Sequence, residues 1–283
     1  MNLFDDWNDH LSTILELNEP DKKSAHYYYF QEIEREIIEK PRRLHVPDGF
    51  HCPPELSEGF ALLKTYIESG KNLKPFLSKG IDRLKSIDPL FAQWNVRHFH
   101  LGDKIENGFI RRTGPLAFAK IASDDVYILW IGSHGDWSSK NIIQSAHDNW
   151  PFLLEDNLLE GITNINASGS QSEIDQSRAN MTSTYVKVDD GTQYIFGDMT
   201  ISGHNFSVMS ASCHMMRVFA MIEADIKKQL AIEAVYSASQ PKLSFQEGKY
   251  IVECTQTGFS SDITDTLTQQ LSRVIEPIRR REA

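Results

Sequence analysis

Hydrophobic residues recur at helical spacing along the first ninety residues. One apolar stripe covers residues 3–15 and stops at Glu19 and Pro20, and a second covers residues 24–38 and ends before Pro41. A third helix is expected over residues 55–69, with Gly70 in the usual C-terminal position, and a fourth over residues 73–86. The proline-rich segment 41–54 between them is predicted to be an ordered loop.

The hydrophobic period then changes from helical to extended. Apolar runs of strand length cover residues 94–101, 115–121 and 126–131, and short polar segments separate them. Sequential strands with short connections predict an antiparallel meander. A short helix is expected over residues 139–149, closed by Trp150 and Pro151.

A second region follows a segment rich in Asn, Ser, Gly and Gln at residues 164–176, which predicts a loop or a domain boundary. Its expected elements are two hairpins and two amphipathic helices, at residues 184–196, 208–230, 242–254 and 263–278. We therefore expect an α+β fold with two domains. Residues 1–158 would carry the helical region and a catalytic antiparallel sheet, and residues 159–283 would serve homodimerisation or partner docking.

The composition is typical of globular proteins and indicates where in the cell the protein is expected. Of its 283 residues, 40% are hydrophobic and 24% are charged. No apolar run approaches the roughly 18–20 residues of a membrane helix, and the acidic N-terminus is unlike a signal peptide. The three cysteines, Cys52, Cys213 and Cys254, are far apart and form no CxxC motif. We expect a cytoplasmic protein with reduced thiols and no membrane partner.

The charge distribution points to a polyanion despite a net charge of −10. Residues 71–120 hold ten Lys and Arg against four Asp and Glu, so one basic segment lies within an acidic chain. Such a patch can bind nucleic acid, although a solvated helix face at residues 71–85 explains it equally well. The sequence has no P-loop, GxGxxG, HExxH or GxSxG motif, and we expect no cofactor.

Histidines and tryptophans concentrate in the predicted meander. His98 and His100 lie two apart on a strand and share a face, whereas His134 lies between Gly132 and Gly135, where the chain can bend. Arg111 and Arg112 precede the middle strand. An antiparallel meander can bring these five groups to one edge, where imidazoles would exchange protons and guanidiniums would bind a phosphate.

Three interpretations of this segment remain open. The first is a metal-independent ribonuclease, with catalytic and RNA-contacting residues His98, His100, His134, Arg111, Arg112, Arg97, Lys85, Arg83, Trp94 and Trp137. The second is a metal-dependent hydrolase whose ligands are His98, His100, His134 and Asp136. The third is a non-catalytic protein-interaction module in which the histidines are structural.

Residues 73–150 also resemble the core of RelE/ParE-type toxins. The shared order is a helix with Arg83 and Lys85, a strand at 94–101, the basic turn Arg111-Arg112-Thr113 and strands ending at His134. The resemblance implies a small curved sheet that cleaves RNA, free or ribosome-bound, in a toxin–antitoxin or phage-defence setting with an antitoxin or other protein partner. Arg111 or Arg112 would then bind the phosphate, and His98, His100 or His134 would transfer protons.

Overall fold

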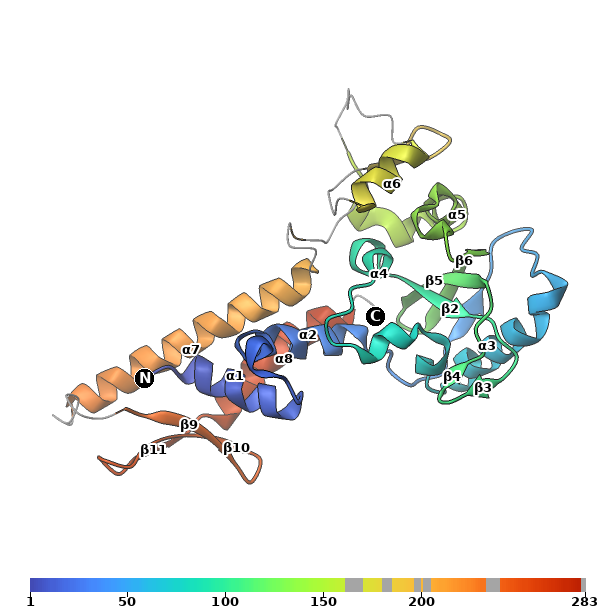
Figure 1. Cartoon of the computed structure of the whole chain (residues 1–283). Helices are drawn as coiled ribbons and strands as arrows, with labels where there is room; N and C mark the ends of the chain where they lie inside the picture. The colour runs from blue at the N-terminus through green and yellow to red at the C-terminus, as the bar shows by residue number, and fades with distance from the viewer. Residues whose placement is uncertain (161–169, 180–184, 196–199, 201–204, 233–239, 281–283) are drawn as a thin grey trace. The chain divides into compact units, whose positions relative to one another are not determined.

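A computed structural model describes residues 1–160, 170–179, 185–195, 200, 205–232 and 240–280, and it confirms the α+β class (Figure 1). The chain divides into two compact units. Unit 1 combines Met1–Arg35 with Ser207–Arg279, and unit 2 is formed by Glu36–Phe206. This division differs from the expected one at residue 158. The first two helices share a core with described residues of the last quarter of the chain, and Ile174, Val186, Val188 and Tyr194 complete the core of the sheet unit.

Unit 1 is a helical layer with a small sheet. Its elements are α1 (Leu3–Ile14), α2 (Ala25–Arg35), α7 (Phe206–Ile232), β9 (Lys242–Gln246), β10 (Lys249–Cys254), β11 (Phe259–Asp262) and α8 (Thr264–Arg280). The strands are antiparallel in the order β11-β10-β9, so the predicted second hairpin gains a third strand. None of the helices that the structure describes, the 27-residue α7 included, is long and apolar enough to cross a membrane.

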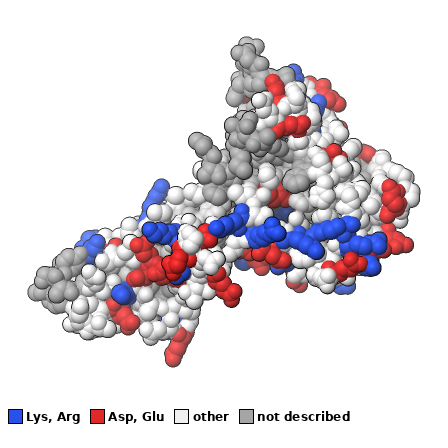
Figure 2. Space-filling model, viewed as in Figure 1, with Lys and Arg blue, Asp and Glu red and all other residues white. Residues whose placement is uncertain are grey.

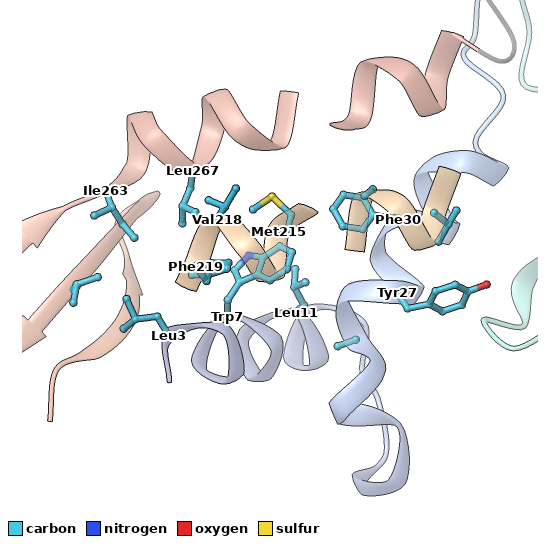
Figure 3. Packing of buried hydrophobic residues seen from close by; sticks show 14 of the residues in the cluster. Leu3, Trp7, Leu11, Tyr27, Phe30, Met215, Val218, Phe219, Ile263 and Leu267 are labelled. Carbon is cyan, nitrogen blue, oxygen red and sulfur yellow. The ribbon is translucent and has the colours of Figure 1, made fainter. Parts of the chain in front are cut away.

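The core of unit 1 forms around Trp7, which is fully buried (Figure 3). Its ring lies 5.3 Å from that of Phe219 on α7, and Phe30 on α2 and Leu267 on α8 belong to the same cluster. Each of these helices therefore buries its apolar stripe against segments far away in the sequence. Packing of this kind, rather than helix propensity, supplies most of the stability of such helices.

Unit 2 is built on a four-stranded sheet in the order β1-β6-β5-β2. The strands are β1 (Arg43–His45), β2 (Val96–His100), β5 (Pro115–Ala122) and β6 (Asp125–Ser133). The three consecutive strands β2, β5 and β6 form the predicted antiparallel meander. The remaining elements of unit 2 are α3 (Ser57–Ser69), α4 (Pro89–Trp94), β3 (Ile105–Glu106), β4 (Phe109–Ile110), α5 (Lys140–Asn149), α6 (Gln171–Ala179), β7 (Tyr185–Lys187) and β8 (Gln193–Ile195).

Both faces of this sheet are covered. Val96, Leu116 and Phe118 pack with α4, α5 and the segment after α5 on one face. Phe99, Ala117 and Ile128 pack with α3 on the other face. Burial on both sides explains why residues 115–119 of β5 are all apolar instead of alternating with polar residues.

Strand β1 is a correction to the loop expected at residues 41–54. It pairs in parallel with β6. The two carboxylate oxygens of Asp125 accept hydrogen bonds from the Arg43 guanidinium at 2.8 Å, and one of them lies 2.6 Å from His45 Nε2. The His45 ring also stacks on Tyr127, with 4.7 Å between ring centroids. A strand of three residues is too short to show a hydrophobic period, and the side-chain contacts that hold it come from residues about eighty positions away.

The helix expected over residues 73–86 is wrong. The structure has two short 3₁₀ helices there, η3 (Lys74–Phe76) and η4 (Lys79–Asp82). Pro75 removes a backbone donor, and Gly80 lies in the middle of the segment, where it disfavours a continuous α-helix. The basic residues of this segment therefore do not share a single helix face.

The first strand of the meander also begins later than expected, because Trp94 ends helix α4 instead of starting the strand. Asp88 caps α4, Pro89 occupies its first turn, and Asn95 ends it in the left-handed conformation with φ of 53°. Strand β2 therefore starts at Val96. His98 and His100 still share a face of β2, but Trp94 packs in the core from the helix.

Three smaller differences concern element ends. Helix α2 stops at Arg35 instead of reaching residue 38. Part of the loop expected at 164–176 is helix α6, while residues 161–169 lie outside the described residues. The other predicted helices, α1, α3, α5, α7 and α8, and both predicted hairpins are confirmed within a few residues in the described ranges.

The core of unit 1 gives a stability prediction. Phe219→Ala removes a fully buried ring that contacts Phe4 and Trp7, and it should lower the unfolding free energy by about 3–5 kcal/mol in denaturant titrations. Met221→Ala on the same helix, at a side chain that is 67% exposed, should cost less than about 0.5 kcal/mol. Equal losses in the two variants would contradict the packing described here.

Candidate functional site

Three histidines meet at one end of the meander. His98 and His100 on β2 lie in register with Phe118 and Leu116 on β5, and these lie in register with Trp130 and Gly132 on β6. The ring centroids of His98 and His100 are 6.3 Å apart, and those of His100 and His134 are 5.3 Å apart. The structure thus brings together all three imidazoles that the sequence singled out.

Asp88 orients His98. One carboxylate oxygen accepts hydrogen bonds from the backbone N–H groups of Leu90 and Phe91 at 3.0 and 3.2 Å, which caps helix α4. The other oxygen lies 3.0 Å from His98 Nδ1. This contact places the proton of the neutral ring on Nδ1 and its lone pair on Nε2. Burial alone would raise the Asp88 pKa, but the bond with His98 and the bond from Phe91 lower it overall.

Asp88 was not among the predicted site residues. A signal was present, because an aspartate directly before a proline is a common way to begin a helix. The apolar residues from 94 onward predicted a strand, and no helix was predicted at residues 89–94. Nothing in the spacing of Asp88 and His98, ten residues apart, indicates that the helix folds back so that the two side chains meet.

His100 is the buried member of the cluster, with only 2% of its surface exposed. Burial lowers its pKa to about 3, and the positive charge of Arg112 and the neighbouring histidines act in the same direction. The Thr113 backbone forms a hydrogen bond with the ring and partly opposes this shift. The ring atom Nδ1 is buried without a hydrogen-bond partner among the described residues. His100 is therefore neutral at physiological pH.

His134 is the exposed member of the cluster. It lies in the turn that follows β6, where the Asp136 carboxylate accepts a hydrogen bond from the Ser133 N–H at 2.7 Å. A Cβ at Gly132 would lie 2.6 Å from Asp136 Oδ2 and 2.7 Å from Trp130 Nε1, so a larger residue there would displace these side chains. The turn thereby presents His134 to solvent beside the buried His100.

Of the two arginines predicted to bind phosphate, Arg112 lies near the histidine cluster, and Arg111 pairs elsewhere. Arg112 is near enough to His100 to lower its pKa, and one of its nitrogens donates to the Leu77 carbonyl at 3.1 Å. Arg111 instead forms an ion pair with Asp103 at 3.0 Å. The structure therefore favours Arg112 as the cation of this site.

The predicted RNA-contacting residues do not form one surface. Arg97 points away from the histidines, is buried, and stacks on Phe91 at 3.7 Å. Trp94 is buried in the core, while Arg83 and Lys85 are exposed after the end of η4. The side chain of Trp137 lies outside the described part of the structure. Trp94 and Arg97 are thus structural, contrary to the expectation that they contact RNA.

The predicted metal ligands are not arranged to bind a metal. In the described part of the chain no three His, Cys, Asp or Glu side chains are grouped for this purpose. His98 Nδ1 faces Asp88, and Asp136 binds the backbone of its own turn. The four residues His98, His100, His134 and Asp136 therefore do not form one ligand set here.

One part of the surface of unit 2 is nevertheless basic, although the unit holds more Asp and Glu than Lys and Arg. Figure 2 shows a band of Lys and Arg side chains across the visible face of the unit that carries the meander, with acidic side chains beside it. Comparisons of the chain with protein-family models, with curated proteins and with solved structures found no match.

The buried His100 predicts a pH dependence of stability. Its pKa is about 3 in the folded protein and about 6.5 in the unfolded chain, so the unfolded chain binds the extra proton between these values. Stability from this group is complete above pH 6.5 and is lost as the pH falls towards 3. The loss of unfolding free energy from this group is at most about 1.4 kcal/mol per pH unit. Urea titrations at pH 7 and pH 5 should show this loss in wild type and not in His100→Leu.

The comparison isolates His100 because His26, whose pKa is lowered by burial to about 4, contributes equally to both proteins. If wild type and His100→Leu lose the same stability between pH 7 and pH 5, His100 is not the neutral buried group described here.

Proposed function

We propose that the protein cleaves RNA without a metal, by attack of a ribose 2′-hydroxyl on the adjacent phosphodiester. The observation that carries the proposal is the histidine cluster, in which an aspartate orients one imidazole and a second imidazole is exposed nearby. This is the equipment of general acid–base catalysis, because imidazole exchanges protons near neutral pH.

His98 is assigned as the general base. Asp88 holds its Nδ1, so the lone pair on Nε2 takes the proton of the 2′-hydroxyl. The 2′-oxygen then bonds to phosphorus while the bond from phosphorus to the 5′-oxygen breaks, which leaves a 2′,3′-cyclic phosphate. Asp88 also stabilises the imidazolium that forms, as a carboxylate does for a histidine base in other acid–base sites.

His134 is assigned as the general acid that protonates the departing 5′-oxygen. Its exposure at the turn after β6 gives a substrate access to the ring. His100 lies between the two reacting histidines in the cluster and stays neutral. We assign it a positioning role, since a neutral buried ring separates two groups that each carry positive charge during the reaction.

Arg112 is assigned to the phosphate. Only one of its nitrogens is engaged by the Leu77 carbonyl in the contact described above, and a guanidinium has five N–H donors. Charge that accumulates on the phosphorane oxygens is stabilised by such donors when they are fixed in advance.

Cleavage of a labelled mixed-sequence RNA tests this function. Wild type should cut with and without EDTA, whereas His98→Ala and His134→Ala should each lose roughly 10²- to 10⁴-fold in rate, which is the usual contribution of one acid or base. His214→Ala in unit 1, where the ring contacts Gln270, is the matched control and should keep full activity.

Cleavage that EDTA abolishes would transfer the proposal to a metal-dependent hydrolase. The absence of cleavage by folded wild type, both on free RNA and on ribosome-bound RNA, would favour a non-catalytic protein-interaction module. The toxin setting, an antitoxin partner and a homodimer remain predictions of the sequence.

Asp88→Asn separates the orienting role of Asp88 from its capping role. Asparagine caps helices as well as aspartate does, so the cap of α4 should be kept. Any fall in thermal stability should come only from the lost contact with His98. The cleavage rate should fall at least 10²-fold, because the amide can place the wrong tautomer on His98. Full activity of Asp88→Asn over pH 5–8 would refute the role of Asp88.

A further inference from the structure

A groove of about 440 Å³ lies beside the part of β6 that extends past its pairing with β1. Residues 47–51 after β1 form one wall, residues 129–131 of β6 form the floor, and one face of α5 forms the other wall. This volume is within the range of small-molecule sites, which is about 300–1,000 Å³. All its walls belong to unit 2, the unit that carries the histidine cluster.

One hydrogen bond joins the two walls of the groove, and two others fix polar side chains of α5 along it. The Asp48 N–H donates to the side-chain oxygen of Asn149 at 2.9 Å, and the Asn149 amide donates to the Ser145 carbonyl at 2.9 Å. On the same helix, Gln144 donates to Asp148 at 2.8 Å. Amide and carboxylate groups are thus fixed along the rim before any ligand arrives.

Trp130 provides an aromatic surface in this groove and connects it to the histidine turn. It is 37% exposed, in contrast to the buried aromatic rings of the same sheet, Phe99 and Phe118. Its Nε1 lies 2.7 Å from the point where a Gly132 side chain would begin, and Asp136 Oδ2 lies 2.6 Å from that point. The indole edge therefore reaches the turn that presents His134.

The charges of the groove, as its described lining residues give them, disfavour an anionic ligand. Asp48 and Asp148 contribute carboxylates, none of the lining residues is Lys or Arg, and His51 is the one lining side chain that can become positive. A phosphate would be repelled here, whereas Arg112 can receive it at the histidine cluster. An aromatic base can stack on an indole, and carboxylates accept hydrogen bonds from exocyclic amino groups of bases.

We propose that this groove binds one unpaired nucleobase of single-stranded RNA next to the scissile phosphodiester, and that it prefers a base with an exocyclic amino group. Trp130 is the stacking surface, and Asp48 and Asp148 are the acceptors. This inference rests on the proposed function, since the ligand is the substrate of the adjacent cluster, and it adds the part of the site that selects the nucleotide.

The test measures binding without cleavage, by fluorescence anisotropy of labelled 2′-O-methyl oligonucleotides of cytosine, adenine or uracil, which cannot be cut by 2′-hydroxyl attack. Trp130→Leu should weaken binding of the cytosine and adenine probes about tenfold or more, the usual loss of one stacked base. Trp130→Phe should keep most of the affinity, and this variant shows whether the site tolerates substitution. Phe152→Leu, at an exposed ring of unit 2 outside the groove, is the matched control.

Base selection is the second readout. Asp148→Asn should reduce the preference for the cytosine probe over the uracil probe, because it replaces an acceptor oxygen by a donor amide. Affinity that depends on Trp130 in a protein that never cleaves RNA would leave the groove proposal standing and reject the proposed function. Equal affinity of wild type, Trp130→Leu and Phe152→Leu, or no binding of any probe by wild type, would overturn the groove proposal.

Discussion

The hydrogen bonds of the Asp88 carboxylate are the interaction on which the candidate site depends. One oxygen begins helix α4 and the other holds His98, so the same side chain sets the local backbone and the orientation of an imidazole. Because α4 ends at Asn95 in a left-handed conformation, β2 starts at Val96 and its even-numbered residues face α5. A helix longer by one residue would shift the start of β2 and, with it, the placement of both histidines on that face.

Burial then gives the histidines different properties. His100 is deep enough to stay neutral, whereas His134 is exposed beside it and His98 is fixed by a carboxylate. Three chemically identical side chains can thus take three roles because their surroundings differ. Arg112 strengthens the difference, since its charge disfavours a proton on His100 and is available to an anionic ligand at the same place.

The amphipathic helices, the meander and the shared face of His98 and His100 were predictable, because each follows from a period within one segment. The sequence also indicated that the chain can bend between Gly132 and Gly135 and expose His134. Contacts between distant segments were not predictable. Strand β1 is held by Asp125 from eighty residues away, and Trp7 joins the N-terminal helices to Phe219. Apolar spacing alone predicted a helix over residues 73–86, but Pro75 and Gly80 disfavour a continuous helix there, and two short 3₁₀ helices form instead.

The central claim is that, without a metal, His98 takes the proton of a ribose 2′-hydroxyl and His134 gives a proton to the departing 5′-oxygen. The most direct measurement is mass spectrometry of the fragment ends from a defined RNA incubated with the protein in EDTA. The account predicts 5′-fragments that end in a 2′,3′-cyclic phosphate and 3′-fragments that begin with a 5′-hydroxyl. Fragments with a 3′-hydroxyl and a 5′-phosphate would show that water, not the ribose, attacks the phosphate, and would contradict the mechanism assigned to these histidines.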